Sequence, residues 1–322
     1  MQTLTRSALL AAGLLLAACG SDGDGSGGNV VPDPASLCVS NDCGSKTVLL
    51  TIPDAENLIF SDSGRLFVSG GTNVYEITRD GEAYQATELY EPGCNFTGLA
   101  IVGNVLYANC FDGQLYAAEL TAQPQLRAIH DYGMAAPNGL ADGPHGELYA
   151  TNGPLATNAL PDPKIVRIDL DPSNPFKVLN QATWFSAGLL GPNGLRRRGD
   201  TLYVSNTGLG GLAEIRTVQI AADGTAGDSA PLLSFIGLPD DFGLVDDHLL
   251  VGNFLTGAIM LYDAQGEQLQ STAPLSFSFP SMVGTGRPPL FATTDILVTE
   301  KGILGDNSSP IGNVLSVFRA TP

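Results

Sequence analysis

An all-β ring, a six-bladed β-propeller whose last blade is closed by the N-terminal strand, is the fold that this sequence predicts. Six similar segments recur along the chain, separated by 41, 41, 55, 47 and 41 residues, a period typical of repeat architectures. Apolar, β-branched and aromatic stretches alternate with Gly, Asp and Asn turns, without long helical periodicity. A β-sandwich does not explain six similar units, and β-helix coils are shorter, so the propeller accounts best for the pattern.

Each unit opens with a polar residue that lies nine or ten residues before a strand-like stretch. In chain order these residues are Glu56, Thr97, Asn138, Asn193, Asp240 and Ser281. The stretches that follow are Leu66–Val68, Leu106–Ala108, Leu148–Ala150, Leu202–Val204, Leu249–Val251 and Leu290–Ala292. The polar residues start the innermost strands of a propeller, so we expect all six at one mouth of the central channel.

Each unit is expected to contain four strands, with the third recurring at a fixed place. In the fourth unit the strands are 194–197, 201–205, 213–220 and 231–235. Third strands are expected at 73–78, 114–120, 164–170, 213–220, 258–263 and 313–318. The last of these nearly ends the chain, and the segment Thr47–Ile52 precedes the first unit without a partner there. We therefore expect this segment to supply the outer strand of the sixth blade.

Four of the six opening residues carry oxygens that suit a hard cation. Glu56 and Asp240 offer carboxylates, and Asn138 and Asn193 offer amide oxygens. This set carries a charge of −2 and suits calcium, or another divalent cation, with positions left for water or substrate. Taken alone, Glu56 is more simply read as a solvated channel carboxylate, and Asn138, Asn193 and Asp240 as parts of turns, since Pro-Asn-Gly and Pro-Asp are common turn sequences. Their shared register favours a metal site, in which Asp241 competes with Asp240 and gapless comparison with the Pro192-Asn193 segment selects Asp240.

The second strands are expected to return to the same mouth. They would end at Gly70, Cys110, Asn152, Asn206, Asn253 and Thr294. The amides of Asn152, Asn206 and Asn253 are thus expected to surround the four candidate ligands. Two long loops, Thr151–Pro163 and Asp295–Gly312, are expected to rise over this mouth and contribute to a substrate pocket.

These motifs resemble the gluconolactonase/regucalcin family and the related diisopropylfluorophosphatases. The resemblance rests on a Glu that opens the first unit, Pro-Asn-Gly in later units and Pro-Asp in the fifth, which fall on Glu56, Asn138, Asn193 and Asp240. It implies a six-bladed propeller with a central calcium that polarises a lactone or ester carbonyl, or a phosphoryl group, and Asp240 as base or nucleophile. The chain departs from the family pattern at Asn57-Leu58, where Gly-Pro is common, and at Ser281, where some relatives carry a histidine.

The N-terminus has the features of an exported lipoprotein. Residues 1–18 read as a signal peptide, and the segment Leu16-Ala17-Ala18-Cys19 resembles the lipobox of bacterial lipoproteins, with Cys19 as the lipidated residue. The other interpretation is a plain signal whose cleavage site adjoins Cys19. Residues 19–45 are expected to form a flexible tether and residues 46–322 the propeller. A lipid anchor in the bacterial cell envelope follows, and Gly20 favours the outer membrane.

The remaining cysteines indicate disulfides, and the net charge limits the kinds of binding partner. Cys38, Cys43, Cys94 and Cys110 are expected to form the disulfides Cys38–Cys43 and Cys94–Cys110, and a zinc site is the weaker alternative. A net charge of −18 argues against nucleic acid as a partner. The only basic cluster, residues 196–198, is interpreted as a solvated hairpin.

Two functions fit these observations. The first is a calcium-dependent hydrolase of a small lactone, ester or related substrate, acting as a lipid-anchored monomer whose only membrane contact is the anchor. The second is a non-enzymatic propeller that binds a protein or glycan at the cell envelope, in which case exposed apolar residues should gather on one face. His130 is expected on an outer strand and His145 and His248 at the far mouth, so any base in the site is a carboxylate or a metal-bound water.

Overall fold

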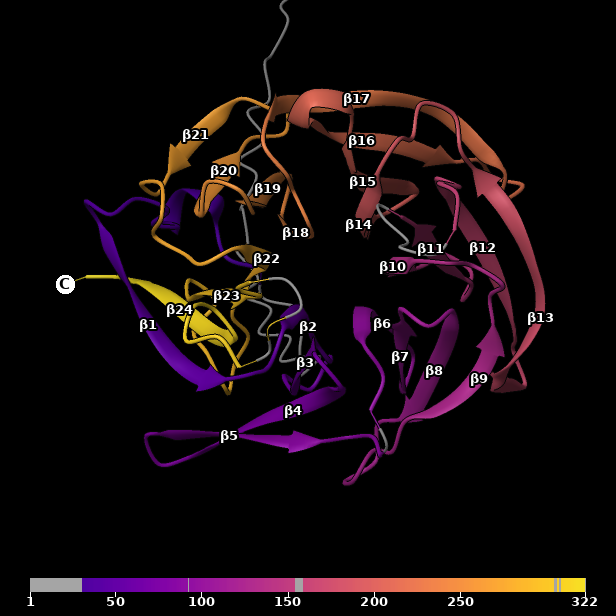
Figure 1. Ribbon diagram of the computed structural model, residues 1–322, viewed down its shortest axis with the longest axis horizontal. Coiled ribbons are helices and arrows are strands. Elements are labelled where there is room, and N and C mark those ends of the chain that lie inside the picture. Colours follow the sequence, from indigo (N-terminus) through magenta and orange to yellow (C-terminus); the bar gives the residue numbers. More distant parts are fainter. Residues whose placement is uncertain (1–30, 92, 154–158, 304–305, 307, 322) are drawn as a thin grey trace, which may run out of the picture.

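The computed structural model describes residues 31–91, 93–153, 159–303, 306 and 308–321, and this part of the chain forms six four-stranded antiparallel sheets arranged in a ring (Figure 1). The predicted six-bladed β-propeller is confirmed. The predicted signal peptide, the lipobox and Cys19 lie outside the described residues. Among the helices in the described part, none is long and apolar enough to cross a membrane.

The first three blades take up the N-terminal half of the ring. Their strands, from the innermost outward, are β2 (Ala55–Phe60), β3 (Leu66–Gly70), β4 (Asn73–Asp80) and β5 (Ala83–Glu88); β6 (Phe96–Val102), β7 (Val105–Cys110), β8 (Gln114–Glu119) and β9 (Arg127–Asp131); and β10 (Pro137–Asp142), β11 (Leu148–Asn152), β12 (Lys164–Asp171) and β13 (Asn174–Phe185).

The last three blades complete the ring. Their strands are β14 (Pro192–Arg198), β15 (Thr201–Thr207), β16 (Leu212–Ile220) and β17 (Ala226–Ile236); β18 (Phe242–Val245), β19 (His248–Asn253), β20 (Ala258–Tyr262) and β21 (Gln268–Ser271); and β22 (Pro280–Thr285), β23 (Ile296–Glu300), β24 (Val314–Ala320) and β1 (Gly44–Thr51). The four strands predicted for the fourth unit and the six predicted third strands are confirmed, with ends shifted by a few residues.

Burial falls from the inside of each blade to the outside. The second strand β7 is buried at every position, whereas the fourth strand β5 is exposed at all but one. A second strand is covered on both faces by the neighbouring blades, which explains its almost continuous apolar sequence. Apolar side chains of adjacent blades meet in six clusters, one at each interface between blades. The core is therefore a set of six wedges around the axis.

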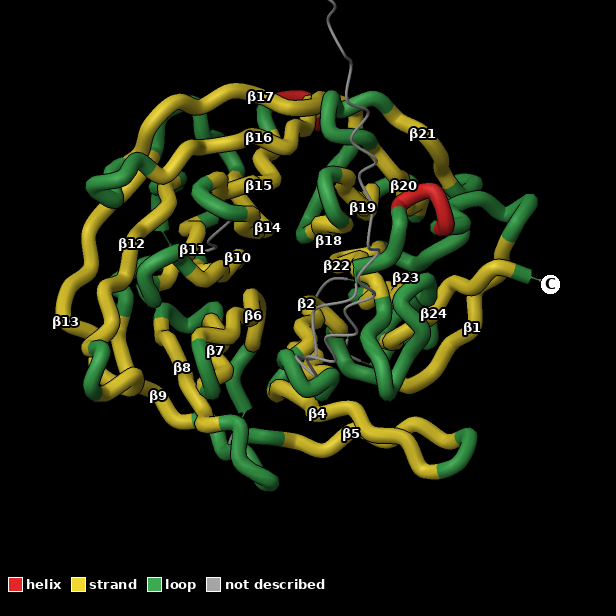
Figure 2. Tube along the Cα trace, turned by 180° about the vertical axis from the view of Figure 1, so that it is seen from behind, coloured by secondary structure: helices red, strands yellow, loops and turns green. Residues whose placement is uncertain are grey.

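The sixth blade is closed by the two ends of the domain. Strand β1 pairs antiparallel with β24, from Gly44 opposite Ala320 to Thr51 opposite Val314. The Thr321 N–H donates to the Cys43 carbonyl at 2.8 Å. The view from behind places the C-terminus beside β1 and β24 (Figure 2). The predicted closure by the N-terminal strand is confirmed.

The packed part of the chain begins before Lys46. A short 3-10 helix, η1 (Pro34–Ser36), precedes Leu37 and Val39, which are buried against the interface of blades five and six. The disulfide Cys38–Cys43 lies in this segment. Residues 34–43 therefore belong to the fold, and the predicted domain boundary at 46 is too late.

The second strand of the sixth blade differs from the prediction. The stretch Leu290–Ala292 lies in a loop, and β23 starts at Ile296. An insertion between β22 and β23 displaces this strand along the sequence, although its apolar pattern resembles that of Leu290–Ala292. Thr294 therefore does not end a second strand, and the predicted loop Asp295–Gly312 begins only after Glu300.

Candidate metal centre at the propeller axis

The six innermost strands line the axis, and five of them carry the same irregularity where they begin (Figure 1). The register of β2 shifts between Ala55 and Leu58, and β6, β10, β14 and β22 shift at the same place relative to their second strands. Such bulges change the direction of side chains at the end of a strand. The bulges contain Glu56, Thr97, Asn138, Asn193 and Ser281, while Asp240 lies two residues before β18. We call this end of the channel the carboxylate mouth.

The main-chain carbonyls of these residues are fixed by donors from the preceding blade. Each donor lies near the end of a second strand and is buried. The pairs are Ser69 Oγ to Thr97 O at 2.6 Å, Asn109 Nδ2 to Asn138 O at 2.8 Å, Thr151 Oγ1 to Asn193 O at 2.6 Å, Ser205 Oγ to Asp240 O at 2.6 Å and Thr299 Oγ1 to Glu56 O at 2.7 Å. In the fifth blade the corresponding residue is Gly252, and there the Asp241 N–H donates to the Ser281 carbonyl at 2.7 Å. The residues that would hold an ion are thus positioned by the contacts between blades.

The Glu56 carboxylate is in contact with a lysine. Glu56 is buried, and its Oε2 forms an ion pair with Lys301 Nζ, which also lies 3.4 Å from Asp54 Oδ2. Glu300, opposite Pro280, ends β23 and takes the place predicted for Thr294, and Lys301 directly follows it. The misplaced second strand of the sixth blade is why this residue was missed. Correct placement of Ile296–Glu300 as the strand would have brought Lys301 to the carboxylate mouth.

Asp240 is held by Ser281 and lies near Asn193. Its Oδ2 accepts a hydrogen bond from Ser281 Oγ at 2.5 Å, and the Asn193 side chain lowers the pKa of Asp240. The Oδ1 atom of Asn193 is buried without a hydrogen-bond partner among the described residues. A buried amide oxygen without a partner is costly unless a ligand supplies one. Ser281 positions Asp240, whereas the Thr97 hydroxyl donates to main-chain carbonyls of the next blade.

Asp241, next to Asp240 in the sequence, has a different set of partners. Its Oδ2 lies 2.8 Å from Arg196 Nη2 and accepts from Asn57 Nδ2 at 2.5 Å, and its Oδ1 accepts from the Phe242 N–H at 2.7 Å. The carboxylate is therefore fully engaged by the protein. Asn57, at which the sequence departs from the family pattern, is one of these partners and also accepts from Arg196 at 2.9 Å.

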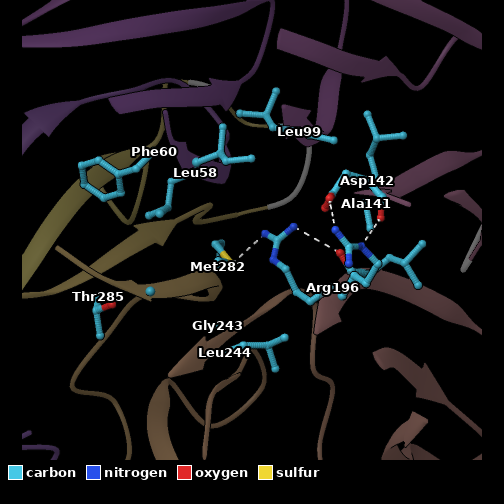
Figure 3. Close-up of a pocket in the computed structure, with 16 residues that line it drawn as sticks. Leu58, Phe60, Leu99, Ala141, Asp142, Arg196, Gly243, Leu244, Met282 and Thr285 are labelled. Atoms are coloured by element: carbon cyan, nitrogen blue, oxygen red, sulfur yellow. Dashed lines mark hydrogen bonds and ion pairs between the residues drawn. The ribbon is translucent and has the colours of Figure 1, made fainter. Parts of the chain in front are cut away.

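The interpretation of residues 196–198 as a solvated hairpin is wrong for Arg196. Its side chain is only 15% exposed and points into the channel, where it also contacts Met282 (Figure 3). It lines a cavity of about 260 Å³ at the opposite mouth, to which all six innermost strands contribute. Arg197 pairs with Asp142, and Arg198 lies over the Tyr203 ring.

Burial dominates the electrostatics of the carboxylate mouth. It raises the pKa of Glu56 to about 8, with a further contribution from the Asp240 carboxylate and opposition from Lys301. It raises the pKa of Asp240 to about 6, against the attraction of Lys301 and the hydrogen bond from Ser281. Burial alone lowers the pKa of Lys301, but the carboxylates of Glu56, Asp54 and Asp240 raise it above its ordinary value. A further positive charge at this mouth would therefore stabilise the ionised forms of these carboxyl groups.

The donor chemistry fits calcium. Glu56, Asp240 and the unpartnered Asn193 oxygen are hard oxygens in a buried site that has excess negative charge. Asn138 is buried in the bulge of the adjacent blade, and Gly139 beside it packs directly against the Asn193 carbonyl. One feature is unexpected for a calcium site, because the Lys301 ammonium already lies against Glu56.

The amides predicted to surround the site lie behind it. Asn152 Oδ1 accepts from the Ala136 N–H at 3.0 Å, and Asn206 Oδ1 accepts from the Gly191 N–H at 3.0 Å. Asn253 Oδ1 accepts more weakly from the Leu238 N–H, at 3.5 Å. Each amide thus holds the main chain two residues before a candidate ligand, Asn138, Asn193 or Asp240. Their role is to fix the approach of the chain to the axis.

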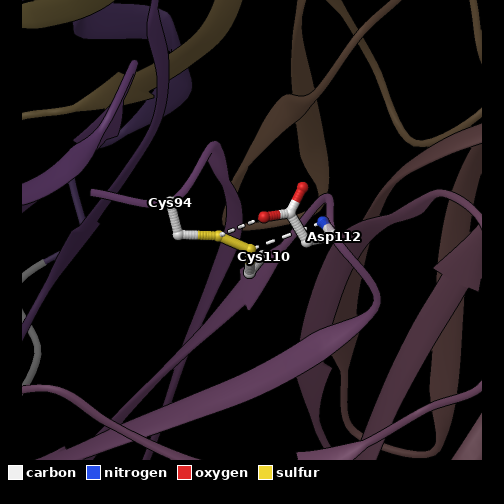
Figure 4. Close-up of side chains that lie close together, drawn as sticks. All are labelled: Cys94, Cys110 and Asp112. Carbon is white, nitrogen blue, oxygen red and sulfur yellow. Dashed lines mark hydrogen bonds between the residues drawn. A yellow bond between two sulfur atoms is a disulfide. The ribbon is translucent and has the colours of Figure 1, made fainter. Parts of the chain in front are cut away.

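The histidines and the Cys94–Cys110 disulfide are not among the candidate ligands. His130 is on the outer strand β9, and His145 and His248 lie in or beside hairpins at the opposite mouth, as predicted. Cys94 and Cys110 form a disulfide, as predicted, beside Asp112 (Figure 4). Since both sulfurs are bonded to each other, the alternative of a zinc site at these residues is not supported.

The carboxylate mouth has an apolar rim. Among the described residues, nine exposed large apolar residues lie in loops or at strand ends on this side, and we call them the apolar rim: Leu160, Leu190, Leu209, Leu212, Ile236, Leu255, Leu275, Ile303 and Ile311. The two long loops that were expected to rise over the mouth contribute Leu160, Ile303 and Ile311. Parts of both loops, 154–158 and 304, 305 and 307, lie outside the described residues.

Comparisons with known proteins extend the fold assignment. No family model matches the sequence, and no curated protein matches it at a significant level. Among solved structures, a gluconolactonase from Xanthomonas campestris superposes with a TM-score of 0.67 at 20% identity, covering 90% of this chain and 94% of that one. A calcium-binding regucalcin from Agrobacterium tumefaciens gives 0.65 at 15% identity, with 86% and 94% covered.

A third structure with a different activity shares the fold. The PQQ-bound aldose sugar dehydrogenase from Streptomyces coelicolor gives a TM-score of 0.62 at 17% identity, covering 86% of this chain and 98% of that one. The predicted resemblance to the gluconolactonase/regucalcin propellers is thus confirmed in the fold. Because propellers of this kind host different reactions, function has to be argued from the site.

Proposed function

We propose that this protein is a calcium-dependent hydrolase of a small lactone, ester or related substrate. The observation that carries the proposal is the buried oxygen set at the carboxylate mouth, in which the Asn193 oxygen has no partner among the described residues. Glu56, Asn138, Asn193 and Asp240 are the residues that would hold the ion, or another divalent cation. A calcium ion bound there would polarise the carbonyl of the substrate. The fold shared with a gluconolactonase and with a calcium-binding regucalcin supports this proposal.

Asp240 is the candidate base or nucleophile. Its carboxylate can accept a proton from an attacking water, and in the metal-free protein burial raises its pKa to about 6. The hydrogen bond from Ser281 fixes one carboxylate oxygen, Oδ2. Histidine is remote from the site, so proton transfer rests on the carboxylates. A neighbouring cavity of about 300 Å³, lined by Asp54, Asn95 and Asp112, offers space for a small polar substrate.

The apolar rim favours a second candidate function. Under the binding hypothesis, exposed apolar residues gather on one face, and the nine residues of the rim do so around the carboxylate mouth. In that case the ion would be structural, and the rim would bind a protein or glycan partner. Hydrolysis of a small substrate is the test that separates the two functions.

We further propose that the protein is attached to the bacterial cell envelope through a lipid on Cys19, with the outer membrane favoured. The lipobox-like segment that ends in Cys19 supports this. The described chain begins on the side opposite the carboxylate mouth, since Asp33, Pro34 and Ala35 lie beside the β18–β19 hairpin. An anchor attached there would leave the carboxylate mouth accessible to a substrate.

Calcium should stabilise the fold and support hydrolysis. We expect the melting temperature of chelator-treated protein to rise on adding calcium, because an ion at about 100 times its Kd contributes about 2.7 kcal/mol. The rise should be much smaller in Glu56→Gln.

A panel of lactones and aryl esters should be hydrolysed only when the metal is present. Asp240→Asn should lose turnover, while its circular dichroism spectrum stays that of the wild type.

Glu82→Gln is the control, because it removes an exposed carboxylate next to the β4–β5 hairpin, outside the proposed ligands and the cavity. It should keep both the calcium shift and turnover. Melting temperatures that do not respond to calcium in the wild type would refute a calcium-dependent function of the wild-type protein. A calcium response without turnover of any substrate in the panel would favour the binding function.

A further inference from the structure

Lys301 is a positive charge inside the site that is proposed to bind a cation. Its main-chain N–H donates to the Phe279 carbonyl at 3.1 Å, and its side chain is only 12% exposed. The ammonium contacts Glu56 Oε2 and lies 3.4 Å from Asp54 Oδ2. A divalent ion that takes Glu56 as a ligand has to replace this ammonium, because the two positive charges repel strongly in a buried site.

A second carboxylate, that of Asp54, is available to pair with the Lys301 ammonium. Asp54, Glu56 and Asp240 place three carboxyl groups around Lys301. If a divalent ion is paired with Glu56 and Asp240, Lys301 and Asp54 remain as a neutral pair. Asp241 does not enter this balance, since Arg196 already neutralises it.

Asp54 is prepared to accept the ammonium. It is 8% exposed, and its Oδ1 is buried without a hydrogen-bond partner in the described part of the chain. Its N–H donates to Asn313 Oδ1 at 2.6 Å, and its φ of 50° is unusual for a residue other than glycine. The backbone thus holds Asp54 in place, with one carboxylate oxygen that lacks a partner.

We propose that Lys301 is an internal counter-cation that competes with the metal for Glu56 and moves to Asp54 when the metal binds. The ammonium neutralises Glu56 in the metal-free protein and thereby lowers the affinity for calcium. Asp54 raises that affinity by receiving the displaced charge. This inference rests on the proposed metal site and adds to it the two residues that set its affinity.

Calorimetric titration of the chelator-treated full chain with calcium alone tests the competition. Lys301→Met should bind calcium at least about tenfold more tightly than the wild type, and Asp54→Asn about tenfold more weakly, each corresponding to about 1.4 kcal/mol. The double variant completes a cycle. In the Lys301→Met background Asp54→Asn should weaken binding by less than about threefold, because no displaced charge needs a partner.

Matched controls separate this effect from general charge. Lys177→Met removes a surface lysine that pairs with Asp171, and Asp112→Asn removes a carboxylate from the same mouth. Both should keep the wild-type affinity. Lys301→Arg keeps the positive charge and should not reproduce the gain of Lys301→Met.

Lys301→Met leaves two carboxylates unpaired and is expected to be less stable in chelator. If it unfolds without metal, it is purified with calcium, and the rate of calcium release into excess fluorescent chelator is measured instead. Release at least about tenfold slower than in the wild type supports the competition.

Each outcome separates the two proposals. Equal affinity or release in the wild type and Lys301→Met overturns the counter-cation and leaves the metal site intact, and so does an equal effect of Asp54→Asn in both backgrounds. Absence of calcium binding in the wild type together with binding in Lys301→Met supports the competition. Absence of binding in both overturns the metal site itself.

Discussion

At the scale of single residues, the two cations of the axis have different surroundings. The Arg196 guanidinium donates to Asn57 and to the Phe242 carbonyl and pairs with Asp241, and it lies deeper in the channel than the candidate ligands. Lys301 has one close partner and one at 3.4 Å. A planar guanidinium with several fixed acceptors is a structural group. The arginine therefore joins blades one, four, five and six at the axis, and the lysine remains free to change partners.

Removing Arg196 should destabilise the protein strongly. Arg196→Met leaves the Asp241 carboxylate buried with only its hydrogen bonds from Asn57 and Phe242. Breaking a buried pair by removing one partner costs about 3–5 kcal/mol. Urea denaturation, followed by circular dichroism, measures this loss of unfolding free energy.

The double variant Arg196→Met with Asp241→Asn is the control for that prediction. It removes both charges, so it should recover a large part of the stability lost in Arg196→Met. Equal losses in the single and the double variant would show that the unpaired carboxylate is not the cause.

At the scale of elements, the second strands position the site. Thr151 on β11 is fully buried, accepts from the Gly139 N–H at 2.8 Å and donates to the Asn193 carbonyl at 2.6 Å. Ser205 on β15 has the same two kinds of contact, to Gly194 and Asp240. One hydroxyl thus joins two blades and fixes two consecutive candidate ligands, Asn138 through its neighbour Gly139 and Asn193 directly.

Thr151→Val should therefore weaken both the fold and the site. Valine has nearly the same shape but leaves the Gly139 N–H and the Asn193 carbonyl without this partner, and each unpaired buried group costs about 1–3 kcal/mol. We expect a lower urea midpoint and a smaller stabilisation by calcium. Thr201→Val on the exposed start of β15 should change the unfolding free energy by less than about 0.5 kcal/mol. A calcium response equal to that of the wild type would contradict a positioning role for Thr151.

The elements also show what the sequence could and could not predict. Five blades keep Leu66–Val68 and its equivalents nine or ten residues after the opening residue, so apolar periodicity was enough to place their strands. The sixth blade fails because the inserted loop contains Leu290–Ala292, which has the same apolar pattern as the displaced strand. The local apolar pattern does not distinguish Leu290–Ala292 from β23. Burial between the blades decides which of the two stretches pairs with β22.

The site was predictable to the same extent. Glu56, Asn138, Asn193 and Asp240 share a register, and the structure places them at one mouth. Lys301 and Arg196 were missed for separate reasons. Lys301 follows the misplaced strand, and Arg196 belongs to a run of three arginines in which only contacts across the channel, to Asp241 and Asn57, distinguish the first from its neighbours.

At the scale of the whole molecule, the ring depends on one pair of strands. β1 and β24 are joined by seven residue pairs that connect the start and the end of the domain. Without β1 the edge of β24 would be exposed, and exposed strand edges promote association. The six interface clusters also need a closed ring, because the first and sixth blades share one of them.

Truncation should therefore have a sharp boundary. A chain that begins at residue 31 keeps every described element and should unfold in one cooperative transition. A chain that begins at residue 52 lacks β1 and should lose that transition and associate, as measured by thermal circular dichroism and light scattering. Cooperative unfolding of the shorter chain would show that the ring closes without this strand pair.

Because the two chain ends close the ring, the candidate site forms late in folding. The contact between Glu56 and Lys301 spans 245 residues, and β24 ends at Ala320. Contacts so far apart in sequence form late, because a long loop must close before they add stability. A growing chain that already contains all four candidate ligands still lacks the last blade, whose Thr299 fixes the Glu56 carbonyl, and the closing strand pair. Ion binding at the axis would thus report that synthesis and folding of the whole chain are complete.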